Sequence, residues 1–142
     1  MTTENLSGRA LDRAVAEAMG WRSVVTGPCA VRDCRTQLVA LVTPSGEHAA
    51  AEHESDAEAV WELCPAFSTD GNAMLEVIAW LAGQGWWVQL SIPRDNLPNL
   101  CLCTLKRYGR EGSKPIIIQE ETNNIAQAVA RAVLAVAGRE DA

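Results

Sequence analysis

The chain has 142 residues, of which 48% are hydrophobic and 21% are charged, with a formal net charge of −6. This length accommodates one domain, residues 1–142, with a core that needs no disulfides. The acidic balance argues against binding to DNA or RNA polymers, which requires a basic surface. Five cysteines is an odd number, and the N-terminus is polar. Since no apolar run approaches the ~20 residues of a membrane span, we expect reduced thiols, no membrane segment and a cytoplasmic location.

The first predicted element is a helix that begins at Asn5 or Ser7 and ends at Gly20, which can adopt a left-handed conformation. Apolar residues recur at helical spacing on one side of it, and polar residues occupy the other. The apolar side holds Leu11, Ala14, Val15 and Ala18, and the polar side holds Arg9, Asp12, Arg13 and Glu17. We therefore place Asp12 on the side away from the core.

Two β-rich runs follow, at Ser23–Val25 and Thr36–Thr43, and a Pro-Ser-Gly turn ends the second. We expect them to pair as a hairpin. The next segment, 47–62, mixes six acidic residues with alanines. Its composition predicts either a solvated helix or a mobile acidic loop, with order only toward its end.

The central stretch is PAFSTDGNAMLEVIAWLAGQGWWVQLSI, residues 65–92. Its Ser-Thr-Asp run can accept the free N–H groups of a first helical turn, so a helix is predicted to begin there. Gly83 and Gly85 are predicted to end it. The period then changes from 3.6 to 2, which indicates a strand. Trp86, Val88, Leu90 and Ile92 point one way, and Trp87, Gln89 and Ser91 point the other.

Two more strands are predicted, at Leu100–Lys106 and Pro115–Gln119, and their short links favour antiparallel pairing. The first of them is apolar on both faces, which is typical of a strand covered on two sides. A last helix is predicted from Thr122 or Asn123 to Gly138. These elements predict an α+β fold: a three-layer α/β/α sandwich with a central, mostly antiparallel sheet and about three helices.

Three stretches carry a resemblance: RALDRAVAEAMGW, PAFSTDGNAMLEVIAWLAGQGWWVQL and ETNNIAQAVARAVLAV. Together they resemble the phage ABA sandwich domain family. That family shows an "LD..VAE..MGW" helix, a "P.YSTD…GW" helix–strand unit and an alanine-rich last helix in the same order. Phe67 departs from the tyrosine that is common in the family, and residues 22–64 match no part of it.

The resemblance implies a phage or prophage protein that acts in the host cytoplasm. The family includes the Thoeris anti-defence sponge proteins, which form oligomers up to hexamers. They sequester cyclic ADP-ribose-type signals, some also hold cyclic oligonucleotides, and they are not enzymes. For this chain the resemblance implies a homo-oligomer, from dimer to hexamer, that binds a cyclic nucleotide.

A nucleotide ligand requires cations for phosphate, an aromatic face for the base, and amides or hydroxyls for ribose. The 94–114 window is locally basic and holds all three kinds of group, near one end of the predicted sheet. We predict the ligand-binding residues to be Arg94, Asn96, Asn99, Arg107, Tyr108, Arg110, Trp87 and Phe67. The alternative is that these arginines are ordinary solvated turn residues.

Motifs for catalysis are absent from the sequence: there is no G-x-S-x-G elbow, no glycine-rich phosphate loop and no histidine beside a nucleophile. His48 and His53, even with Cys29, Cys34 or Cys64, lack the spacing of a zinc site. A helix cap fully explains Asp70. We therefore expect a binding protein with no metal and no cofactor.

Five tryptophans accompany one phenylalanine and one tyrosine, and three of the five lie at 80, 86 and 87. A helix–strand core can bury two of these, so we expect the third in a subunit interface, where tryptophan is enriched. Three functions compete. The favoured one is a sponge that sequesters a cyclic nucleotide signal without cleaving it. The others are a module that blocks a host protein with no small-molecule ligand, and an enzyme that acts on nucleotides.

Overall fold

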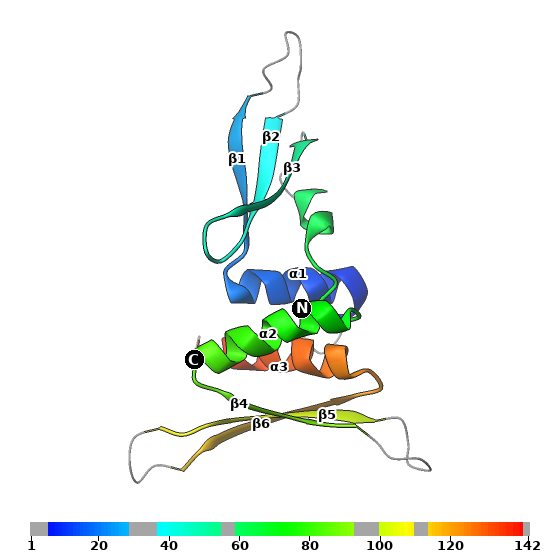
Figure 1. The fold of residues 1–142 in the computed structure, drawn as a ribbon, viewed down its shortest axis with the longest axis vertical. Helices are drawn as coiled ribbons and strands as arrows, with labels where there is room; N and C mark the ends of the chain where they lie inside the picture. The colour runs from blue at the N-terminus through cyan, green and yellow to red at the C-terminus, as the bar shows by residue number, and fades with distance from the viewer. Residues whose placement is uncertain (1–5, 29–36, 55–58, 93–99, 110–113, 141–142) are drawn as a thin grey trace.

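The computed structural model describes residues 6–28, 37–54, 59–92, 100–109 and 114–140. In chain order the elements are α1 (Gly8–Met19), β1 (Arg22–Pro28), β2 (Gln37–Val42), β3 (His48–Glu54), the 3₁₀ helix η2 (Ala59–Leu63), α2 (Gly71–Gly83), β4 (Trp87–Ser91), β5 (Cys101–Arg107), β6 (Ile116–Thr122) and α3 (Ile125–Glu140). The three α-helices lie in the middle of the molecule, between two sheets (Figure 1).

The α+β class, the three helices and the antiparallel pairing are confirmed. The strands form two three-stranded sheets, β1-β2-β3 and β4-β5-β6, where the sequence predicted one central sheet. In the second sheet, α3 packs on β5 and β6, and α2 contacts β4. The helices lie on only one face of this second sheet (Figure 1). Exposed and covered residues therefore alternate along β4 and β6. The sequence predicted that the strand at β5 is covered on both faces. β5 is the central strand of this sheet, and the helices cover only one face of it.

The hairpin predicted in the N-terminal half is confirmed, since β1 and β2 pair antiparallel from Arg22 opposite Val42 to Pro28 opposite Gln37. The prediction of a solvated helix or mobile loop is wrong for residues 48–54, which form β3 and pair antiparallel with β2. The predicted order toward the end of the 47–62 segment is confirmed, since residues 59–63 form η2 and Val60 and Trp61 are buried. The backbone of β2 offers hydrogen bonds on both edges, so β3 pairs there despite the poor β propensity of alanine and glutamate.

The helix ends follow the predicted chemistry with small shifts. Gly20 ends α1 at a φ of 102°, and the Asp70 carboxylate caps α2 by accepting the Asn72 N–H at 3.0 Å. Gly85, at a φ of 91°, is the left-handed residue after α2, whereas Gly83 is still helical. Asn124 caps α3, one residue later than predicted, because its side-chain oxygen accepts the Ala126 N–H at 2.9 Å.

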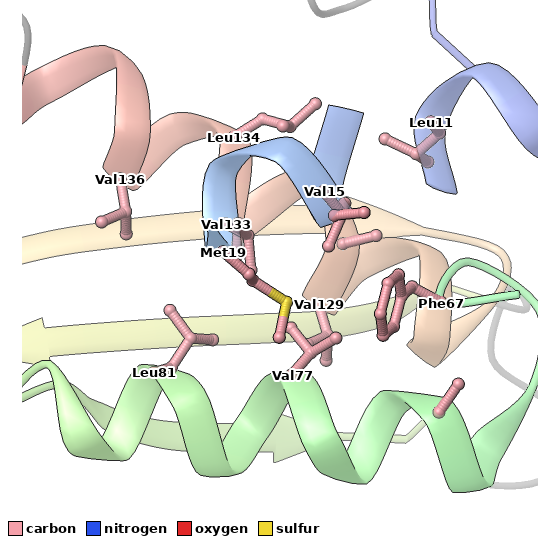
Figure 2. Close-up of a cluster of buried hydrophobic side chains, with 14 of the residues drawn as sticks. Leu11, Val15, Met19, Phe67, Val77, Leu81, Val129, Val133, Leu134 and Val136 are labelled. Atoms are coloured by element: carbon pink, nitrogen blue, oxygen red, sulfur yellow. The ribbon is translucent and has the colours of Figure 1, made fainter. Parts of the chain in front are cut away.

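The core lies where the three helices meet above the β4-β5-β6 sheet. Figure 2 shows side chains from α1, α2 and α3 pointing toward one another, with Phe67 at one end of the cluster. Its fully buried members include Leu11, Val15, Phe67, Val77, Leu81, Val129, Val133 and Val136. Phe67 meets Trp21 edge to face, with the ring centroids 6.1 Å apart. The helix-to-strand unit thus positions β4 by packing α2 against α3, which also contacts α1.

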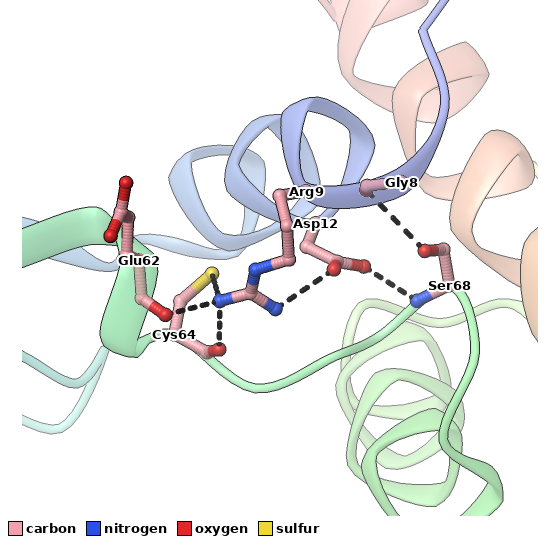
Figure 3. Close-up of polar contacts among 6 residues, drawn as sticks. All are labelled: Gly8, Arg9, Asp12, Glu62, Cys64 and Ser68. Atoms are coloured by element: carbon pink, nitrogen blue, oxygen red, sulfur yellow. Dashed lines mark hydrogen bonds and ion pairs between the residues drawn. The ribbon is translucent and has the colours of Figure 1, made fainter.

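A buried polar network ties α1 to the segment before α2 (Figure 3). The Asp12 carboxylate, with its side chain 2% exposed, is 2.9 Å from the Arg9 guanidinium and accepts the Ser68 N–H at 2.7 Å. Arg9 also donates to the carbonyls of Glu62 and Cys64, each at 2.6 Å. The prediction that Asp12 faces away from the core is therefore wrong, because helical periodicity cannot show that another segment covers a polar residue.

None of the helices in the described part of the chain is long and apolar enough to cross a membrane.

Candidate functional site

One face of the β4-β5-β6 sheet carries no helix or strand of the described chain (Figure 1). We call it the outer face. Strand register places its residues in three rows, because residues directly opposite each other on paired strands point to the same side. Row one is Trp87, Lys106 and Ile117; row two is Gln89, Thr104 and Gln119; row three is Ser91, Leu102 and Glu121.

Strand alternation explains why these residues lie together. The residues between them on each strand point toward the helices, where Val88, Leu105 and Ile118 form a row of their own. Leu105 is fully buried, and Ile118 is 7% exposed. The outer face is thus an inevitable product of covering one side of the sheet.

Row one is the most apolar and most exposed part of the outer face. Trp87 is 74% exposed and Ile117 is 51% exposed, and Lys106 lies between them on β5. Tyr108, 66% exposed, follows directly after β5 at the same end of the sheet. This end therefore offers two accessible aromatic rings and an ammonium group.

Arg107 lies beside this group, on the helix side of the sheet. Its guanidinium stands 4.6 Å above the ring of Trp86, which is 3% exposed. This is a cation–π contact, in which the guanidinium is attracted to the negative face of the indole ring. The Arg107 side chain also shields Trp86 from solvent. The Trp86 indole N–H is buried with no acceptor among the described residues, so its ring is held by packing and by Arg107 alone.

The structure brings three of the predicted ligand residues together, namely Trp87, Arg107 and Tyr108, at the β4 start and the β5 end. Phe67 is a wrong prediction, because its side chain is fully buried in the helical core and no ligand can reach it. Arg94, Asn96, Asn99 and Arg110 lie outside the described residues.

Of the predicted set, Arg107 and Tyr108 follow Lys106 at the end of β5 where Lys106 pairs with Trp87. The expectation that the whole set gathers at one end of the sheet stays a prediction, because four of its residues lie outside the described part of the chain.

Sequence reasoning missed Lys106, Ile117 and Glu121 as members of this surface. Strand alternation is the signal that could have found them: every second residue of β5 shares a face with Lys106, and every second residue of β6 shares a face with Ile117. It could be used only once the register was known, since a shift of one residue exchanges the two faces.

A second polar feature is a hollow of about 300 Å³ between α1 and η2, lined by Arg9, Ala10, Arg13, Trp61 and Glu62. Its cations already have partners. Arg9 is held by the network of Figure 3, and Arg13 lies 5.1 Å above the Trp61 ring and pairs with Glu17 at 2.7 Å. We therefore assign this hollow a structural role in joining η2 to α1.

Two of the three described thiols, Cys64 and Cys103, are poorly suited to reaction. Burial raises the pKa of Cys64. The pKa of Cys103 is raised to about 12, mainly by burial and to a smaller extent by the nearby Glu120 carboxylate. A thiolate is the reactive form of cysteine, so neither group serves as a nucleophile at neutral pH. Within the described ranges, no three His, Cys, Asp or Glu residues gather in a group that could hold a metal ion.

Comparisons with protein-family models, with curated proteins and with solved structures find no match to this chain. The chemistry of the outer face is therefore the basis for assigning a function to this chain. The resemblance to the sandwich family stays a hypothesis beside it.

Proposed function

We propose that this protein binds a cyclic nucleotide of the cyclic ADP-ribose or cyclic oligonucleotide type and holds it without cleaving it, as a phage-encoded anti-defence sponge in the host cytoplasm. The observation that supports this most directly is the grouping of Trp87, Tyr108 and Lys106 at one end of an open sheet face. The sponge role itself derives from the sequence resemblance.

The grouping matches the chemistry of such a ligand. A purine base stacks on an indole or phenol ring, and such stacking contributes about 1–3 kcal/mol per base. Lys106 supplies three N–H donors and a positive charge for a phosphate. A cyclic nucleotide is compact and bears both kinds of group, so one end of a three-stranded sheet is wide enough to contact it.

The outer face favours retention over turnover. Its residues offer the hydroxyl of Ser91 and the amides of Gln89 and Gln119, whereas Thr104 is buried, and the three rows include neither a histidine nor a cysteine. General acid–base catalysis on a phosphodiester most often uses histidine, and an activated nucleophile needs a base beside it. We therefore propose binding without chemistry.

The test is calorimetry of the full chain against cyclic ADP-ribose isomers and cyclic di- and trinucleotides, followed by recovery of the ligand by chromatography. We expect saturable binding and intact ligand. Trp87→Ala and Tyr108→Ala should each weaken binding at least about tenfold, which corresponds to the loss of one stacking contact. Leu75→Ala is the matched control, since Leu75 is 59% exposed on α2. Absence of binding to every member of the panel refutes the proposal.

A protein-interaction module is the second candidate, and a specific observation favours it. Of the eight exposed large hydrophobic residues in the described chain, Trp87 and Ile117 share row one of the outer face, and Leu100 and Tyr108 adjoin the two ends of β5. Apolar residues gathered on one exposed surface mark an interaction site more often than scattered ones do. A chain that binds no nucleotide but retains one host protein through this sheet, and loses it on Trp87→Ala, would establish this second function.

A further inference from the structure

We propose that the free edge of β6 binds an extended segment of another protein, which adds a fourth strand to the β4-β5-β6 sheet. The segment runs antiparallel to β6, with lysine or arginine opposite Glu120 and Glu121 and β-branched residues opposite the isoleucines at 116–118. The contact lies at the edge of the sheet, so Trp87 and Lys106 on the outer face stay accessible. This edge site requires no bound nucleotide.

β6 is an edge strand with regular pairing along its whole length. It lies last in the order β4-β5-β6, and its seven residues, Ile116–Thr122, all pair with β5 without a register shift. Within the described ranges, no turn or loop forms a backbone hydrogen bond to it. The amide and carbonyl groups of alternate residues in an edge strand point away from the sheet, so β6 offers a template for another strand.

The first half of β6 has none of the features that protect an edge strand from pairing. Such features are charged residues, proline, a bulge or a short strand, whereas residues 116–118 are three isoleucines in regular register, and Ile117 is 51% exposed. The other described edge strands differ. β1 and β3 each have a register shift against β2, and β4 has only five residues. β6 is therefore the described edge best suited to accept a strand.

The second half of β6 is acidic, and this determines the chemistry of the partner. Glu121 is exposed, and its neighbour on β5 is Leu102, so strand pairing within the described sheet places no cation opposite it. A strand added at the open edge places one of its side chains directly opposite Glu121. Opposite charges in such a cross-strand pair stabilise the pairing, and like charges destabilise it. The partner segment should therefore be basic at this end.

The same distribution of residues disfavours a second copy of β6 as the partner. Antiparallel pairing of two copies over all seven residues centres on Gln119, and Ile117 of each copy then lies opposite Glu121 of the other. Such a contact covers each carboxylate with an apolar side chain and gives it no cation, which is unfavourable. A foreign segment that is basic and then β-branched, in N-to-C order, matches the edge along its whole length.

The test is fluorescence anisotropy of a labelled peptide, Gly-Lys-Lys-Thr-Val-Ile-Val-amide, titrated with the full chain and no nucleotide. Its two lysines are placed opposite Glu121 and Glu120, and its last three residues opposite residues 116–118. We expect saturable binding with a dissociation constant of roughly 10–100 μM, because main-chain hydrogen bonds to a sheet edge supply most of the affinity. The same peptide with glutamates in place of both lysines should bind at least about tenfold more weakly.

Two N-methylated versions of the lysine peptide test whether it pairs through its backbone. Successive N–H groups of a strand point to opposite sides, so methylation of every second amide blocks one side and leaves the other free. The version whose methyl groups face β6 should lose binding, and the version whose methyl groups face away should bind as the unmodified peptide does. Equal binding by the two versions, or loss of binding in both, overturns the proposal.

A charge reversal on the chain tests the placement of the peptide. Glu121→Lys should weaken binding of the lysine peptide at least about fivefold and strengthen binding of the glutamate peptide. Glu76→Lys makes the same change at an exposed position on α2, and it should bind both peptides as wild type does. Circular dichroism melts show whether both variants fold. A wild-type chain that does not bind the lysine peptide at about 500 μM overturns the proposal. So does a folded Glu121→Lys chain that keeps the wild-type preference.

Discussion

The Asp12 network offers the sharpest test of how this fold is held together. Asp12→Ala removes the acceptor of the Ser68 N–H and the partner of Arg9 in one change. A hydrogen bond to a charged group contributes about 1.5–3 kcal/mol, and a buried N–H left without an acceptor costs about 1–3 kcal/mol. The Arg9 side chain is 48% exposed, so its ion pair adds little after solvent screening.

We therefore expect Asp12→Ala to lower the free energy of unfolding by about 3 kcal/mol, and the melting temperature by roughly 10 °C. Asp12→Asn keeps an oxygen that can accept the Ser68 N–H, so it should cost only about 1–1.5 kcal/mol.

Urea unfolding followed by circular dichroism measures both values. Glu17→Ala is the control: it removes an exposed α1 ion pair of 2.7 Å and should cost less than about 0.5 kcal/mol. An Asp12→Ala chain as stable as the Glu17→Ala chain would show that the network contributes nothing, and would refute this reasoning.

Three further outcomes are expected. Phe67→Ala should lower the free energy of unfolding by about 3–5 kcal/mol in urea titrations, because a fully buried ring leaves a cavity, whereas Leu75→Ala at an exposed position should be near neutral. Asp70→Ala should cost about 1 kcal/mol in the same assay through loss of the α2 cap, and a larger loss would indicate a further role for this carboxylate. The pKa of Cys103 is raised from 9.0 to about 12, so its protonated thiol favours the folded state. That stabilisation is complete below about pH 9 and is lost as the pH rises toward 12, and the urea midpoint of wild type should therefore fall more between about pH 8 and 10.5 than that of Cys103→Ala.

The local elements of this protein follow from its sequence. The Ser-Thr-Asp run before α2, the glycines at 20 and 85 and the change of period at Trp86 identify helix ends and strand alternation, and the structure confirms them. These signals suffice because caps, left-handed turns and side-chain period depend only on residues a few positions apart. The same alternation correctly separated Trp87 from Trp86.

The contacts between segments far apart in the chain were decided only by the tertiary structure. Asp12 became buried because the segment before α2 covers it, and β3 formed because β2 had a free edge, although its own residues favour helix or loop. The division into two sheets and the open outer face depend on which strands pair, and local patterns do not encode the pairing of distant strands. For the same reason Phe67 proved to lie in the core, since a position in sequence sets a side chain's neighbours along the chain but not what packs over it.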